Sequence, residues 1–71
     1  MKKNKIQIYI NGKKKNINSN YNLINILEEY SLKDKMLAVE INQEVIPKSM
    51  YKTITLNKND KIEILELIGG G

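Results

Sequence analysis

The chain opens with a regular alternation of apolar and polar residues. Ile6, Ile8 and Ile10 would point to one side of an extended backbone, and the residues between them to the other. A period of two is typical of a β-strand that is buried on one face only. The sequence therefore predicts a half-buried strand over residues 5–10.

A turn and a lysine-rich segment follow this strand. Asn11 and Gly12 both tolerate positive φ, which a two-residue hairpin turn requires. The returning segment, residues 13–18, carries three lysines and has Ile17 as its main apolar side chain. Because charged side chains discourage pairing between the sheets of different molecules, we expect this segment to be an edge strand.

Helical spacing appears after the hairpin. Four residues recur at intervals of three and four, which places them on one face of a helix: Leu23, Ile26, Leu27 and Tyr30. Asn22 precedes them and is a favourable N-cap residue. We therefore expect a short helix that ends near Ser31 and turns these four side chains toward the core.

The second half of the chain alternates twice more. Residues 37–41 predict a third strand, followed by a turn at 42–44 and a short extended piece at 45–46 that Pro47 ends. Residues 48–60 predict an irregular segment with a small apolar patch and a final polar turn. The last strand is predicted over residues 61–68.

This order of elements resembles the β-grasp fold of ubiquitin-like proteins. We expect one α+β domain over residues 1–71, with a mixed sheet of four to five strands and one helix across one face. The first and last strands are the most regular apolar segments, so they should lie side by side in the middle of the sheet.

The composition excludes most kinds of catalytic site. The 71 residues include no Cys and no His, which removes thiolate nucleophiles, imidazole chemistry and the usual zinc ligands. Glu28 and Glu29 could suggest a carboxylate pair, but neighbouring helix residues do not face each other. We therefore expect a protein that is not an enzyme, binds no metal and has no cofactor of its own.

The net charge of +4 raises a second possibility, a lysine-rich domain that binds nucleic acid or other partners. All twelve basic residues are Lys, whereas bidentate contacts to guanine and phosphate are made by Arg. No apolar run approaches the roughly 20 residues of a membrane span. We expect a soluble, cytoplasmic protein that binds neither nucleic acid nor membranes.

Three of the four glycines occupy the last three positions, Gly69, Gly70 and Gly71. Glycine has no side chain and accepts almost any φ and ψ. We expect these residues to form a flexible tail that can thread a narrow channel and present its terminal carboxylate to another enzyme. The alternative is a frayed end without function, since chain termini are commonly disordered.

Segments along the whole chain resemble one known family, the ThiS-type sulfur carriers of thiamine biosynthesis. The similar segments are IYING at 8–12, LINIL at 23–27, LAVEINQEVIPKS at 37–49, DKIEI at 60–64 and IGGG at 68–71. The central segment and the tail are the most specific of these. The family often has Gly-Asp where this chain has Asn59-Asp60, and Asn also tolerates the left-handed conformation.

The resemblance implies a reaction at the carboxylate of Gly71. In this family an activating enzyme uses ATP to adenylate the terminal glycine, and sulfur from a desulfurase persulfide then gives a thiocarboxylate. That group donates sulfur to the thiazole ring of thiamine, which thiazole synthase builds. The small subunit of molybdopterin synthase, with the same fold, tail and chemistry, remains an alternative.

Two apolar residues precede the tail in the last predicted strand. If alternation continues, Leu65 and Leu67 lie on the face opposite Ile62 and Ile64. They would then form an exposed docking patch for the activating enzyme and the synthase. A twist or bulge in the strand would instead return both leucines to the core.

Overall fold

The computed structural model describes residues 4–67, which form one sheet, one α-helix and one 3₁₀ turn. The elements, in chain order, are β1 (Lys5–Ile10), β2 (Lys13–Asn18), α1 (Leu23–Glu29), β3 (Leu37–Ile41), β4 (Glu44–Val45), η1 (Lys48–Met50) and β5 (Lys61–Glu66). The order agrees with the sequence prediction, apart from η1, which lies in the segment predicted to be irregular.

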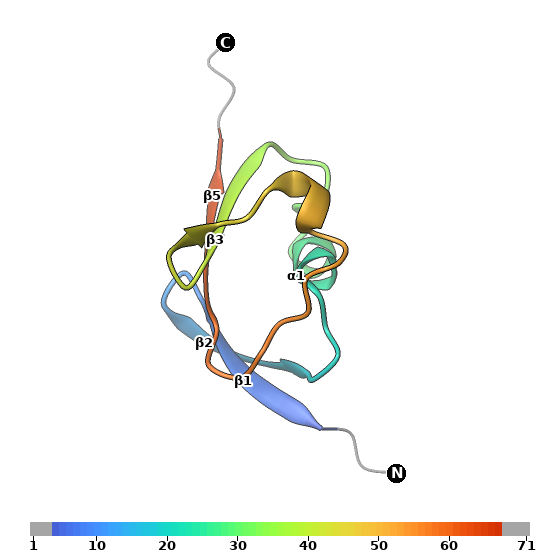
Figure 1. Ribbon diagram of the computed structural model, residues 1–71, viewed down its shortest axis with the longest axis vertical. Coiled ribbons are helices and arrows are strands. Elements are labelled where there is room, and N and C mark those ends of the chain that lie inside the picture. Colours follow the sequence, from blue (N-terminus) through green and yellow to red (C-terminus); the bar gives the residue numbers. More distant parts are fainter. Residues whose placement is uncertain (1–3, 68–71) are drawn as a thin grey trace.

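The five strands lie in the order β2-β1-β5-β3-β4 (Figure 1). The central pair, β1 and β5, is parallel, with Tyr9 opposite Lys61 and Ile10 opposite Ile62. Every other pair in this sheet is antiparallel. The mixed β-grasp sheet, its central first and last strands and its lysine-rich edge strand are therefore confirmed.

Both hairpin turns depend on residues in the left-handed region. Asn11 and Gly12 have φ values of 50° and 84°, and Asn42 and Gln43 have values of 53° and 72°. A two-residue turn with positive φ at both positions matches the twist of the strands that it joins. The second turn is one residue shorter than predicted, because Glu44 already pairs with Ile41 in β4.

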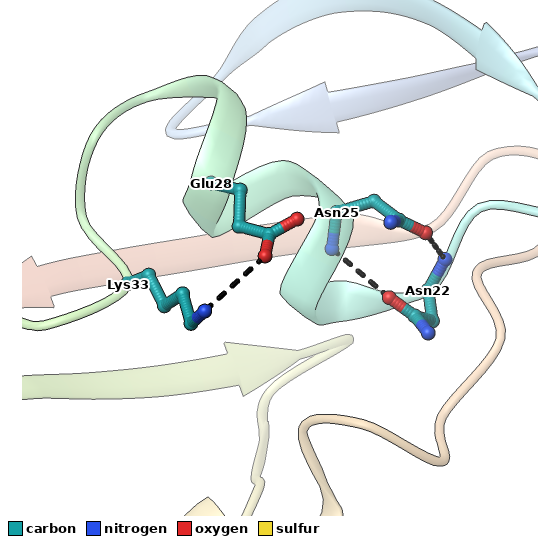
Figure 2. Close-up of polar contacts among 4 residues, drawn as sticks. All are labelled: Asn22, Asn25, Glu28 and Lys33. Carbon is teal, nitrogen blue, oxygen red and sulfur yellow. Dashed lines mark hydrogen bonds and ion pairs between the residues drawn. The ribbon is translucent and has the colours of Figure 1, made fainter.

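A reciprocal pair of side-chain hydrogen bonds fixes the start of α1 (Figure 2). The backbone N–H of Asn25 donates to Oδ1 of Asn22 at 2.9 Å, and the N–H of Asn22 donates to Oδ1 of Asn25 at 2.9 Å. This capping box satisfies donors that the first helical turn leaves unpaired. The helix ends at Glu29, earlier than predicted, and Ser31 adopts a φ of 59°.

The core lies between α1 and one face of the sheet (Figure 1). The side chains with almost no exposed surface come from five elements or segments: Ile8, Leu23, Ile26, Leu27, Val39, Leu56 and Ile62. These residues include three of the four predicted on the apolar face of the helix. The sheet strands meet them at the predicted alternate positions.

The prediction that Tyr30 completes this helix face is wrong. Tyr30 is the C-cap residue and is 45% exposed. The helix ends one residue earlier, so the ring lies beyond the core, and Lys15 Nζ stands 5.4 Å from its centroid. A cation over a tyrosine face is weakly attracted by the ring, even at an exposed site.

The segment between Pro47 and β5 packs along α1. The N–H of Leu23 donates to the carbonyl of Ile54, and the N–H of Ile24 to the carbonyl of Tyr51, each at 3.2 Å. Leu56 and Tyr51 bury their side chains against the core. The sequence predicted an apolar patch here but did not identify Tyr51 as part of the core.

No helix within residues 4–67 is both long enough and apolar enough to cross a membrane.

Candidate functional site

The candidate site begins where β5 leaves the sheet. β5 ends at Glu66, and Leu67 is the last residue that the structure describes. The predicted reactive residue Gly71 and the tail residues Gly69 and Gly70 lie outside the described residues. The structure therefore shows how the chain is held just before the tail.

On one side, β5 is paired with β3 along its whole length. Ala38 lies opposite Leu65 and Glu40 opposite Glu63. The N–H of Leu67 donates to the carbonyl of Met36 at 2.8 Å, so this pairing continues one residue past the strand. In an antiparallel ladder alternate residues bond to the same neighbour. The odd-numbered residues of β5 therefore bond to β3, and the even-numbered ones face β1.

On the other side, a side chain takes over where β1 ends. The N–H of Asn11 donates to the carbonyl of Ile62 at 2.8 Å, and then the chain turns away. Asn11 Oδ1 accepts the N–H of Ile64 at 2.8 Å, and its Nδ2 donates to the Ile64 carbonyl at 3.3 Å. The side-chain amide of Asn11 thus makes the two hydrogen bonds to Ile64 that the backbone of a longer β1 strand would make.

The second hairpin turn holds the start of β5 in a similar way. Oδ1 of Asn42 accepts the N–H of Lys61 at 3.0 Å, and the N–H of Asn42 donates to the Lys61 carbonyl at 2.7 Å. Nδ2 of Asn42 also donates to Oδ1 of Asp60 at 2.9 Å. Two turn asparagines, each with positive φ, therefore fix β5 at Lys61 and at Ile64.

Glu66 is the first even-numbered position of β5 beyond the reach of Asn11. Within residues 4–67 its backbone groups have no hydrogen-bond partner on the β1 side. Its carboxylate lies 3.8 Å from Nζ of Lys35, and both side chains are about half exposed. The end of β5 is thus supported on one side only.

Both predicted docking residues are exposed, Leu65 by 64% and Leu67 by 45%. They do not share a face, however. Leu65 lines a hollow on the open face of the sheet with Ala38 and Glu63. Leu67 lines a separate hollow with Leu37 and Tyr51 on the helix side. Strict alternation therefore holds for Leu65, whereas Leu67 follows the end of the strand and turns toward the helix.

Within residues 4–67 no group of three or more acidic side chains lies close enough together to hold a metal ion. Burial raises the pKa of Tyr51 above its ordinary value, so this phenol is neutral at pH 7.

Sequence analysis did not identify the roles of Asn11 and Asn42 at β5. Both were recognised only as turn residues, because their partners, Ile64 and Lys61, are distant along the chain. An Asn at a hairpin turn gives no indication of where its amide points. The pairing of β1 with β5 decides this for Asn11, and the pairing of β3 with β5 decides it for Asn42.

Comparisons with known proteins agree with the fold. A family model described as the ThiS family matches residues 3–71. The thiamine biosynthesis protein ThiS from Geobacter metallireducens has a crystal structure that is similar at a TM-score of 0.78. It is 25% identical in sequence, and the match covers 93% of this chain and 100% of that chain.

Two curated relatives extend the comparison. The sulfur carrier protein ThiS of Bacillus subtilis is 41% identical over 46 residues, which cover 65% of this chain and 70% of that protein. A thiazole synthase from Paramagnetospirillum magneticum is 36% identical over 66 residues. That match covers 93% of this chain and 20% of the synthase, so the chain spans about a fifth of its length. On the match to its whole length and on the shared fold, the chain belongs to the ThiS family of β-grasp sulfur carriers.

Proposed function

We propose that this protein carries sulfur as a thiocarboxylate on the C-terminal carbon of Gly71, for the thiazole ring of thiamine. The observation that carries the proposal is the position of β5. This strand is central in the sheet, is fixed by Asn42 and Asn11, and leads directly into the sequence of three glycines. A rigid base followed by residues without side chains suits a chain end that must enter another protein's active site.

The chemistry needs activation, because a carboxylate is a poor electrophile. In the proposed first step an oxygen of the Gly71 carboxylate attacks the α-phosphorus of ATP, and pyrophosphate leaves. The terminal sulfur of an enzyme persulfide then attacks the acyl carbon, and AMP leaves with the electrons of the broken C–O bond. A thiol next cleaves the S–S bond, which leaves the thiocarboxylate on Gly71 and a disulfide on the enzyme.

In this scheme the side chains of the carrier do not react. An activating enzyme binds the ATP, a desulfurase supplies the persulfide, and thiazole synthase accepts the sulfur. Leu65 and Leu67 are proposed to contact these partners, since both are large apolar side chains exposed next to the tail. Because they line separate hollows, they would touch different parts of a partner's surface.

The relative named thiazole synthase supports the proposed partnership with such an enzyme. A segment similar to 93% of this chain forms part of that protein. Proteins whose domains are joined in one chain in one organism often work together as separate chains in another. We infer that the carrier delivers its sulfur to a thiazole synthase.

Deletion of Gly70 and Gly71 tests the proposal. The shortened protein should keep the melting temperature of the intact chain and should give no ATP–pyrophosphate exchange with the activating enzyme. A variant with one Trp added after Gly71 should be equally inactive, because the carboxylate is then displaced and the channel must accept an indole. Exchange by either variant at the rate of the intact protein would refute a reaction at Gly71.

A further inference from the structure

A second surface feature lies on the helix side of the molecule, away from Leu65. A hollow of about 470 Å³ opens between the loop after α1 and the segment that contains η1. Three lysines line it, Lys33, Lys48 and Lys52, together with one carboxylate, that of Asp34. Ile24 and Tyr51 contribute apolar surface. Figure 1 shows η1 beside α1 at this position.

The hollow continues toward the tail. A smaller hollow of about 170 Å³ shares Lys33, Lys48 and Tyr51 with it and is also lined by Lys35 and Leu67. We call the two together the lysine groove, with the residues named here and above. One end of the lysine groove is therefore formed by the last residue described before the glycines.

The positive charge of the lysine groove is only partly balanced. Lys33 lies 3.5 Å from a carboxylate oxygen of Glu28, the pair drawn in Figure 2. Lys35 is paired with Glu66 in a similar exposed contact, and such contacts are weak and easily exchanged for other partners. Within the described part of the chain, Lys48 and Lys52 have no carboxylate within ion-pair distance.

On the open face of the sheet, the hollow that Leu65 lines has two carboxylates and no lysine among its lining residues. Leu65 stands there beside Glu40 and Glu63, which lie directly across from each other on β3 and β5. The end of β5 is thus flanked by an acidic hollow on one side and by the lysine groove on the other. Such a difference can fix the orientation in which a partner approaches, because like charges oppose each other in the wrong orientation.

We propose that the lysine groove binds an acidic segment of the enzyme that activates the tail. Carboxylates of this segment pair with Lys48 and Lys52, and an apolar side chain lies against Ile24 and Tyr51. The apolar floor distinguishes such a peptide from a nucleic acid backbone, which would leave this surface without a partner. The identity of the partner rests on the proposed function.

A charge-reversal experiment with a matched control tests the proposal. The double variant Lys48→Glu/Lys52→Glu should bind the activating enzyme of the same organism about tenfold more weakly at low salt, and the difference should shrink at high salt. The control Lys13→Glu/Lys58→Glu makes the same change in net charge at exposed residues outside the groove. It should change the dissociation constant by less than about twofold.

Equal weakening by the two variants would overturn the proposal, because net charge and not the groove would then decide binding. The milder pair Lys48→Ala/Lys52→Ala, with unchanged melting temperature, should still weaken binding about threefold. A second measurement uses a poly-uridine RNA. If Lys48→Glu/Lys52→Glu weakened binding of this RNA and left the affinity for the activating enzyme unchanged, the groove would be assigned to nucleic acid and the proposal would be overturned. The proposed function is judged separately: it fails if the unmodified protein gains no sulfur, whatever the affinities.

Discussion

The two halves of β5 differ in how the rest of the sheet holds them. From Lys61 to Ile64 the strand is bonded on both sides, to β3 and to β1 or Asn11. From Leu65 to Leu67, the last residue described, the chain is bonded within residues 4–67 only to β3 and to Met36, and both leucines are exposed. In the described part of the chain, the first half of β5 is therefore held from both sides, and the residues that precede the glycines are held from one side.

This division has a physical reason. A residue that reacts inside another protein must leave its own fold, and the backbone next to it must remain free of tertiary contacts. The fold loses little by this, because Ile62 is the last buried core residue in the described part of the chain and only Ile64 still packs against the core beyond it. Substitutions in the first half should consequently lower the free energy of unfolding, and substitutions in the second half should lower the affinity for the activating enzyme.

The largest effect on stability is expected at Ile62, which is 1% exposed. Ile62→Ala removes apolar contacts and leaves a cavity, so it should lower the free energy of unfolding by about 2–5 kcal/mol. The matched change Leu65→Ala on the same strand should cost less than about 1 kcal/mol. Urea denaturation of both variants measures the difference, and equal losses would show that the two halves are not distinct. Ile8→Ala, also in the core, should behave as Ile62→Ala does.

Most of the core and of the elements around it could be predicted from the sequence. Alternation placed Ile8, Val39 and Ile62 in the core, because a half-buried strand leaves a period of two in its residues. Asn11-Gly12 predicted the first hairpin for reasons of backbone geometry alone. Tyr30 was misassigned because a helical pattern does not show where the last turn ends, and boundaries depend on local caps.

A smaller effect is expected from the side-chain bonds that end the fixed half. Asn11→Gly keeps a residue that tolerates positive φ but removes both bonds to Ile64, so it should cost about 1–2 kcal/mol. Hydrogen exchange should show faster exchange of the Ile64 amide. Asn42→Gly should instead affect the Lys61 amide.

Asn11→Asp serves as the conservative control, because a carboxylate oxygen can still accept the Ile64 N–H. It should preserve most of the protection at Ile64 that Asn11→Gly loses. If Asn11→Gly left this protection unchanged, the side chain would not be holding β5.

The second half of β5 was less predictable, because it depends on contacts between distant segments. The alternation of apolar and polar residues correctly predicted that Leu65 is exposed. It did not predict that Leu67 lies beside Leu37 and Tyr51. The lysine groove likewise brings Lys33 together with Lys48 and Lys52, although β3, a turn and β4 separate them along the chain. Composition showed many lysines, and only the packing of η1 beside α1 gathers these three.

The smallest effect on stability is expected from Leu65→Ser combined with Leu67→Ser. Both side chains are substantially exposed, so the double variant should lose about 1 kcal/mol or less. Its affinity for the activating enzyme should nevertheless fall, since the proposed contacts are apolar. A calorimetric scan together with a binding titration separates the two effects. A large fall in melting temperature would place these leucines in the core instead.

The central claim is that sulfur is attached to Gly71 and to no other residue. Its most direct test is mass spectrometry of the protein after incubation with the activating enzyme, ATP, a desulfurase and cysteine. The account predicts a mass gain equal to the replacement of one oxygen by sulfur, located in the C-terminal peptide. Sulfur on any other peptide, or thiazole formation supported by the chain without Gly70 and Gly71, would contradict it.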